Sequence, residues 1–120
     1  MERRELGRWG EEQAARFLRL RGWRIVERNY RCRMGEVDLI AERRGVLAFV
    51  EVKLRKDAAF AEAREFVTPA KRERIRTTAA LWLAEHETAS QPRFDVIEVY
   101  APKGESSLFP KINHIENAFE

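Results

Sequence analysis

The sequence predicts an α/β domain with a mixed central β-sheet flanked by helices. Three observations predict this fold class. Apolar residues recur at helical spacing near the start of the chain, three short strand-like runs follow, and a second helical pattern precedes one or two further strands. Helices and strands in this order are typical of an α/β domain whose sheet contains both parallel and antiparallel neighbours.

Length and composition agree with one globular domain over residues 1–120. A chain of 120 residues can bury a single core, and 44% hydrophobic with 36% charged residues is typical of a folded protein with a charged surface. The single cysteine, Cys32, cannot form an internal disulfide. No apolar run approaches the ~20 residues of a membrane span, and the first residues lack the apolar core of a signal peptide. We therefore expect a cytoplasmic protein.

Positive charge is concentrated in two segments of the chain. Residues 1–33 contain ten Arg or Lys against five Asp or Glu, and residues 52–76 contain eight against four. Residues 77–120 have the opposite balance, with three basic residues against seven acidic ones. This asymmetry favours a polyanionic partner such as nucleic acid, whose phosphates are bound chiefly by Lys and Arg. A solvated charged surface without a ligand would give the same distribution.

Two helices are predicted. In Glu5–Arg21 apolar residues recur every three or four positions, and Gly22 is suited to ending the helix. The second helix is predicted from Pro69, with Thr68 as its N-cap, to about His86. Basic side chains occupy its first turns, where the helix dipole favours acids, and this conflict indicates an end that faces an anion.

Four runs are predicted as strands, and the last run, Lys111–Phe119, as a short strand or an edge segment, because apolar and β-branched residues alternate or dominate in them. Residues 31–35 and 43–45 are predicted turns, in which Gly45 supplies the positive φ of a tight hairpin. Residues 54–67 are predicted to form a mobile loop or a short irregular helix, and residues 101–110 a loop. The five runs are Trp23–Tyr30, Glu36–Glu42, Val46–Leu54, Phe94–Tyr100 and Lys111–Phe119.

The central hairpin carries the candidate chemistry. If Arg44 and Gly45 form a two-residue loop, Asp38 lies opposite Glu51, and by the same register Glu36 lies opposite Lys53. Opposed carboxylates destabilise a sheet unless a positive charge lies between them, and a divalent cation is the obvious candidate. Glu51 and Lys53 also project from one face of a very apolar strand, where charges are rare without a purpose. The alternative is an exposed salt-bridged pair.

Two carboxylates and one lysine at this point suit phosphodiester hydrolysis. Mg²⁺ takes oxygen ligands and is commonly held by one or two carboxylates together with substrate phosphate. Lys53 would then orient the attacking water or stabilise the transition state. His86 and His114 are far apart in the sequence and are interpreted as structural. Neither a zinc-binding spacing nor a glycine-rich phosphate loop is present.

The residues Asp38…Glu51-Val52-Lys53 resemble the D…(D/E)-x-K signature of restriction-endonuclease-like nucleases. More specifically, the chain resembles the YraN-like family of bacterial proteins, which are usually described as candidate endonucleases. Motifs from one end of the chain to the other carry this resemblance. They are Gly7-Arg8 with Gly10-Glu11, Asn29-Tyr30-Arg31, Gly35–Ile40, Phe49–Lys53, Val67–Lys71, Arg93–Val96 and His114 with Asn117-Ala118-Phe119.

The resemblance implies a restriction-endonuclease-like domain that uses Mg²⁺ or Mn²⁺. The family is similar in motif layout to archaeal Holliday-junction resolvases, and by that similarity Glu11 joins Asp38 and Glu51 as a metal ligand. Junction substrates would favour a homodimer, because symmetric cutting of two strands needs two sites.

The leading hypothesis is a metal-dependent endonuclease that hydrolyses DNA, branched DNA included. Asp38, Glu51 and Glu11 would hold the metal, and Lys53 would be the catalytic cation. Two alternatives stay open: a nucleic-acid-binding module without catalysis, and a protein-interaction adaptor that binds neither nucleic acid nor metal. If the protein is a nuclease or a nucleic-acid-binding module, the phosphate backbone of the nucleic acid would be held by Arg28, Arg31, Arg33, Lys71, Arg72 and Arg74.

Overall fold

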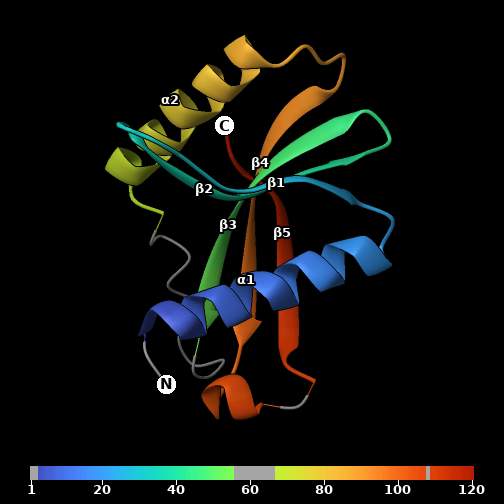
Figure 1. Ribbon diagram of the computed structural model, residues 1–120, viewed down its shortest axis with the longest axis vertical. Helices are drawn as coiled ribbons and strands as arrows, with labels where there is room; N and C mark the ends of the chain where they lie inside the picture. Colours follow the sequence, from blue (N-terminus) through green and yellow to red (C-terminus); the bar gives the residue numbers. More distant parts are fainter. Residues whose placement is uncertain (1–2, 56–66, 108) are drawn as a thin grey trace.

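The computed structural model describes residues 3–55, 67–107 and 109–120, which form a mixed five-stranded sheet flanked by two helices (Figure 1). This confirms the predicted fold class. The elements in chain order are α1 (Arg3–Leu20), β1 (Arg24–Cys32), β2 (Gly35–Arg43), β3 (Val46–Arg55), α2 (Pro69–Glu85), β4 (Gln91–Tyr100), the short 3₁₀ helix η3 (Gly104–Ser106) and β5 (Lys111–Phe119).

The predicted elements are confirmed, with ends that move by up to three residues. The largest change is in β4, which begins at Gln91 instead of Phe94. The Thr68 side chain accepts the Lys71 N–H, as expected of an N-cap. The predicted loop at residues 101–110 contains η3. Of the segment predicted as a loop or irregular helix, residues 54 and 55 belong to β3 and residues 56–66 lie outside the described part of the chain.

The strands follow one another across the sheet in chain order. The β1–β2, β2–β3 and β4–β5 pairs are antiparallel, whereas β3 and β4 are parallel because α2 lies between them in the chain. Arg44 and Gly45 have φ values of 48° and 80°, so the β2–β3 loop is the predicted two-residue turn with both residues left-handed. The register Leu39–Val50 follows from this turn.

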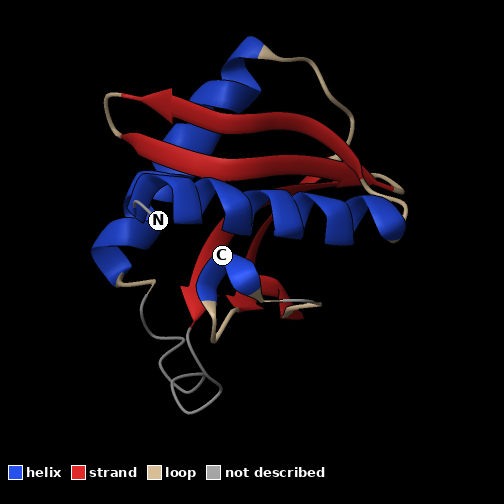
Figure 2. Cartoon of the chain, turned by 60° about the horizontal axis from the view of Figure 1, so that its bottom comes forward, coloured by secondary structure: helices blue, strands red, loops and turns tan. Residues whose placement is uncertain are grey.

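Each face of the sheet is covered by one helix, so the strands lie between the two helices (Figure 2). Alternation along the strands divides the apolar residues into two layers. The layer between the sheet and α1 contains Leu18 of the helix and Leu39, Ala48, Val50, Ile97 and Val99 of the strands. The layer between the sheet and α2 contains Ile75 and Trp82 of the helix and Ile40, Leu47, Phe49 and Val96 of the strands.

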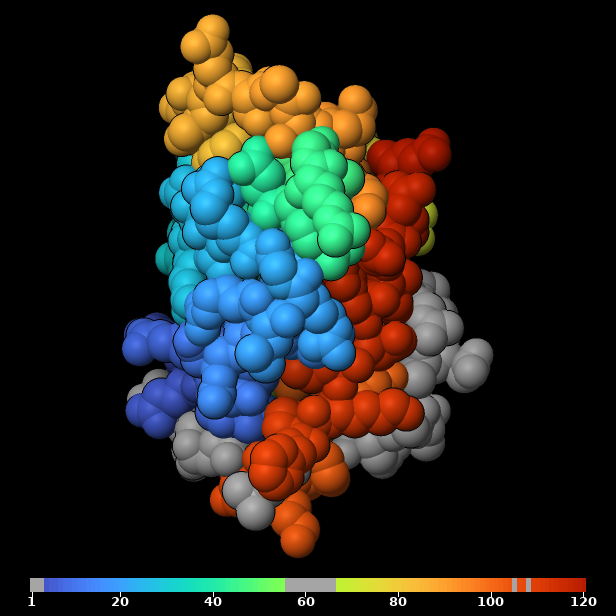
Figure 3. All heavy atoms as spheres, turned by 90° about the vertical axis from the view of Figure 1, so that its right-hand side faces the viewer, coloured from blue at the N-terminus to red at the C-terminus, as the bar shows by residue number. Residues whose placement is uncertain are grey.

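Helix α1 approaches the sheet closely at Gly10. A Cβ atom at this position would lie 2.5 Å from Cδ1 of Leu54 on β3, so any larger residue would require that side chain to move. The close approach places the next residue, Glu11, over the sheet. Further along α1, Phe17 meets His114 of β5 edge-on, with ring centroids 6.2 Å apart. Helix α1, in blue, and strand β5, in red, therefore lie side by side on one face of the molecule (Figure 3).

Within the described residues, no helix combines the length and the apolar character needed to cross a membrane.

Candidate functional site

The candidate site lies where β2 and β3 separate. Their pairing ends at Leu39–Val50, so Asp38 and Glu51 are the next residues on the two strands. The Val52 backbone N–H donates to Oδ2 of Asp38 over 2.8 Å. The Asp38 carboxylate thus accepts a backbone hydrogen bond of β3 that a neighbouring strand would otherwise accept, and this bond fixes the position of the carboxylate.

The predicted pairing of Glu36 with Lys53 is not formed. Beyond Leu39, β2 continues its pairing with β1, where Glu36 lies opposite Arg31 and accepts a hydrogen bond from its Nε over 3.0 Å. Lys53 instead pairs with Glu98 of β4 in the strand register. The register predicted from the turn does not extend to this pair, because β2 and β3 separate after Leu39–Val50 and are no longer joined by hydrogen bonds.

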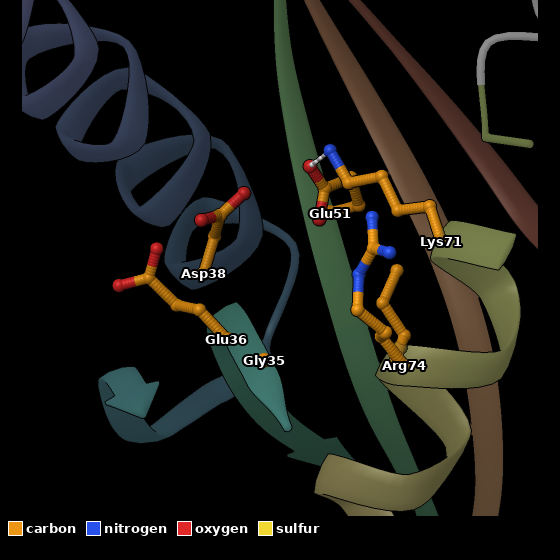
Figure 4. Close-up of a pocket in the computed structure, with 7 residues that line it drawn as sticks. Gly35, Glu36, Asp38, Glu51, Lys71 and Arg74 are labelled. Carbon is orange, nitrogen blue, oxygen red and sulfur yellow. Dashed lines mark ion pairs between the residues drawn. The ribbon is translucent and has the colours of Figure 1, made fainter. Parts of the chain in front are cut away.

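A cavity of about 120 Å³ opens between the separated strands and the first turns of α2. Figure 4 shows two side chains of β2 on one side of the cavity and Glu51 with side chains of α2 on the other. The lining residues are Gly35, Glu36, Asp38, Glu51, Lys71, Arg74 and Ile75.

Four carboxylates affect one another at this cavity. Burial, and then the charge of Glu51, raises the pKa of Asp38 to about 8, and the charges of Glu11 and Glu36 act in the same direction. Burial also raises the pKa of Glu11, together with the charges of Glu36 and Glu51 and in spite of a hydrogen bond with Asp38. Without a cation, this cluster of like charges costs folding free energy.

Glu11 is brought to this cluster by α1, as the family resemblance implies. One carboxylate oxygen accepts a hydrogen bond from Nδ2 of Asn29 over 2.9 Å. Asn29 has a φ of 52°, an unusual conformation within a strand, and lies in β1 beside the position of Asp38 in β2. The left-handed conformation of Asn29 in β1 and the separation of β2 from β3 therefore both occur where Glu11 meets Asp38.

Two lysines contact Glu51, which is 8% exposed. Nζ of Lys71 is 2.8 Å from Oε1 of Glu51, and Nζ of Lys53 is 3.4 Å from the same oxygen. Burial, and then the neighbouring Lys71, lowers the pKa of Lys53. Burial alone would lower the pKa of Lys71 as well, but its hydrogen bonds to Glu51 and Lys53 and the charges of Glu51 and Asp38 together outweigh burial and raise the pKa. Lys71 is thus the closer counter-ion of Glu51.

The donor set fits a hard divalent cation that keeps much of its water. Within the described residues, no three Asp, Glu, His or Cys side chains form a ready ligand group. Mg²⁺ does not require one, because one or two carboxylates with water and substrate phosphate commonly suffice. Asp38 offers a buried carboxylate that no ion pair reaches within the described residues, and Glu51 offers a second. All these donors are oxygens, as Mg²⁺ and Mn²⁺ prefer.

The six basic residues predicted to bind nucleic acid are divided among several environments. Lys71 and Arg74 line the cavity. Arg28 is paired with Glu12 over 2.8 Å, and Arg33 is exposed in the β1–β2 turn. Arg72 donates from Nε to the carbonyl of Val67 over 2.7 Å and does not line the cavity. Arg31, which is paired with Glu36, lies on the side of the site that faces α1.

Sequence reasoning missed one member of the site, Glu36, and one contact, that of Lys71 with Glu51. Glu36 lines the cavity although it was expected opposite Lys53, because at this point β2 is paired with β1 and no longer with β3. Lys71 was predicted as a phosphate contact, but its ammonium lies against Glu51. The signal for Lys71 was present in the sequence, since a lysine in the first turn of a helix opposes the helix dipole.

The comparisons with known proteins agree on one family. The model of the "Uncharacterised protein family UPF0102" matches residues 10–99. The chain is 49% identical over 119 residues to a UPF0102 protein of Nocardia farcinica, covering 98% of this chain and 91% of the relative. It is 44% identical over 122 residues to a UPF0102 protein of Syntrophomonas wolfei, covering 97% and 98%.

A UPF0102 protein of Myxococcus xanthus is 42% identical over 120 residues, covering 99% of this chain and 92% of the relative. These similarities extend over nearly the whole of each chain, so they include the two helices and all strands around the cavity. The chain belongs to the uncharacterised protein family UPF0102, the family that its motifs resemble.

Proposed function

We propose that this protein is a metal-dependent endonuclease of the cytoplasm that hydrolyses phosphodiester bonds in DNA, branched DNA among the candidate substrates. The observation that carries the proposal is the buried Asp38 carboxylate in a group of four carboxylates, beside two lysines and a cavity of about 120 Å³. Such a group is costly in the free protein, and a divalent cation would offset its negative charge and bind a substrate phosphate.

Each residue has a task in this proposal. Asp38 and Glu51 would hold Mg²⁺ or Mn²⁺, and Glu11 would be the accessory ligand. When bound, the ion would supply charge stabilisation on the phosphate and a more acidic water. Glu51 would exchange its contact with Lys71 for the ion, and Lys71 would then be free to meet a phosphate. Lys53, which shares the oxygen of Glu51, would orient the water or stabilise the transition state.

The test is cleavage of a panel of DNA substrates: single strand, duplex, flap and four-way junction, each with Mg²⁺, Mn²⁺ or chelator. We expect metal-dependent cutting of at least one substrate by the wild type. Cutting should be lost in Asp38→Asn and Lys53→Ala, because these changes remove a metal ligand and the catalytic cation. Preference within the panel would identify the substrate class.

Matched controls protect this test against a contaminating nuclease. Glu87→Gln and Lys103→Ala remove the same charges at exposed positions outside the cavity, and both should cut like the wild type. Binding of DNA without cutting by any preparation would reject the nuclease and favour the non-catalytic binding module. Equal cutting by wild type and Asp38→Asn would also contradict the proposal.

If the four-way junction is the preferred substrate, we propose that the active form is a homodimer with two sites. Sedimentation at micromolar concentration should then show a dimer. A monomer alone under these conditions would contradict this part of the proposal.

A further inference from the structure

A second cavity, of about 300 Å³, lies beside the candidate site on the side that faces α1. Glu36 lines both cavities, and Glu11 lines the second. The carboxylate group therefore lies between two openings: one at the first turns of α2 and one at the first turns of α1. The second cavity is lined by Arg4, Gly7, Arg8, Glu11, Asn29, Arg31 and Glu36.

Three arginines from two elements surround this second cavity. Arg4 and Arg8 are exposed on α1, and neither forms an ion pair with another described residue. Arg31 comes from β1 and pairs with Glu36 over 2.9 Å. The carboxylates of Glu11 and Glu36 are half-buried, so the cations lie at the rim and the acids lie deeper. This order suits a phosphate at the rim whose strand continues toward a metal held by the acids.

The helix backbone leaves the cavity open at Gly7. A Cβ atom at this position would meet nothing within 4 Å, apart from the helix itself. Glycine in the middle of a helix costs roughly 0.5–1 kcal/mol relative to alanine, so the position is not explained by helix stability. Gly7 lines the second cavity, so a longer side chain at this position would lie at the wall of that cavity.

We infer that the cavity of Arg4, Arg8 and Arg31 is a phosphate subsite that holds the nucleic-acid backbone beside the scissile phosphate. This inference rests on the proposed nuclease function and specifies its substrate. With Lys71 and Arg74 at the other opening, cations lie on both sides of the carboxylates. The site therefore takes an internal phosphodiester of a polynucleotide, and a mononucleotide would leave one side empty.

The test measures binding of DNA to the full chain by fluorescence anisotropy, with Ca²⁺ in place of Mg²⁺. The two fluorescein-labelled probes are a 20-nucleotide single strand and a 20-base-pair duplex. Arg8→Ala and Arg4→Ala/Arg8→Ala remove the contacts, and alanine is the best helix former. Each lost phosphate contact should weaken binding about 5–10-fold and make the slope of log K against log salt shallower by about 1. In the double variant this slope should become shallower by about 2, because two phosphate contacts are removed.

Two further variants separate contact from general charge. Arg16→Ala removes the same charge from an exposed position two turns further along α1 and should keep the wild-type slope. Gly7→Glu keeps every arginine but places a carboxylate at the cavity, and it should weaken binding at least as much as Arg8→Ala. Circular dichroism of each variant verifies that the helix is intact.

The outcomes distinguish this inference from the nuclease proposal. Wild-type binding by Arg8→Ala, or an equal loss in Arg16→Ala, would overturn the subsite even if the wild type cuts DNA. Binding that depends on Arg8 without any cutting would support the subsite and reject the enzyme. If the wild type binds neither DNA probe, the subsite is overturned, whereas the nuclease is judged separately by the cleavage panel with its flap and four-way junction.

Discussion

Asp38→Asn should reduce metal-dependent cleavage by about 10³-fold, or about 4 kcal/mol of transition-state stabilisation. Asparagine can still accept the Val52 N–H with its amide oxygen, so the backbone at the strand separation should be kept. What it loses is the negative charge that a divalent cation requires. The measurement is the single-turnover rate on the substrate that the wild type cuts fastest.

The same variant should be more stable than the wild type when metal is absent. Burial and the neighbouring carboxylates raise the pKa of Asp38 to about 8, so the wild type at pH 7 carries a cost either for the charge or for taking up a proton. We expect the free energy of unfolding in urea with chelator to rise by about 1–2 kcal/mol.

Added Mg²⁺ separates the two effects of Asp38. At ten times its dissociation constant it should stabilise the wild type by about 1.4 kcal/mol, and it should stabilise Asp38→Asn far less. Glu87→Gln, which changes an exposed carboxylate, should respond to Mg²⁺ like the wild type. Reduced stability of Asp38→Asn without metal would contradict our account of the carboxylate group, even if cleavage is lost.

Asp95→Asn should lower the free energy of unfolding by about 3–5 kcal/mol, because it removes the buried anion of a partly buried guanidinium and leaves that guanidinium only an exposed one, Glu116. Asp95 on β4 is fully buried and accepts two hydrogen bonds from Arg93, each over 2.9 Å. It also accepts from Nε2 of His114 over 2.7 Å and from the Asn117 N–H over 3.0 Å. The bonds from His114 and Asn117 join β4 to β5 on the side of the sheet opposite α2.

The chain offers a matched control for Asp95 at Glu116. Its carboxylate accepts from the same Arg93 over 2.9 Å, but its side chain is 52% exposed. Glu116→Gln should therefore cost less than about 1 kcal/mol, as exposed ion pairs do. Urea unfolding of both variants at pH 7 measures the difference. A loss at Glu116 as large as that at Asp95 would show that burial does not decide the effect.

The Asp95 network also predicts how stability depends on pH. Burial alone would raise the pKa of Asp95, but the hydrogen bonds from His114, Arg93 and the Asn117 N–H outweigh it and hold the pKa below its usual range. A carboxyl with a lower pKa in the folded state contributes stability that is complete above about pH 4 and is lost as the pH falls further. Between pH 4 and pH 2, Asp95→Asn should therefore lose less stability than the wild type.

Local rules were enough for most of the fold. Thr68 and Pro69 define the start of α2, and Gly45 with its neighbour defines a two-residue turn, because cap and turn geometry involve only adjacent residues. This two-residue turn then fixes the register of β2 against β3 as far as the pair Leu39–Val50. Asp38 and Glu51 could therefore be placed next to each other from the sequence, one step beyond the last pair.

Local rules fail where the strands separate. The register predicted Glu36 opposite Lys53, but a constant register holds only while hydrogen bonds join the strands. The position of Glu11 was implied by family resemblance and could not be predicted from residue spacing. Glu11 reaches the site because its neighbour Gly10 lets α1 come close to Leu54, and this contact depends on how the helix packs against the sheet.

The sequence by itself determined the helices, the strands, the central hairpin and three candidate residues on it: Asp38, Glu51 and Lys53. Only the tertiary structure decided that Glu36 faces the cavity, that Lys71 lies against Glu51, and that Arg4 and Arg8 border a second opening. The physical reason is the range of the interactions involved. Hydrogen-bonded turns and alternating side chains are set within a few residues, whereas electrostatic contacts between α1, β2 and α2 depend on packing between distant segments.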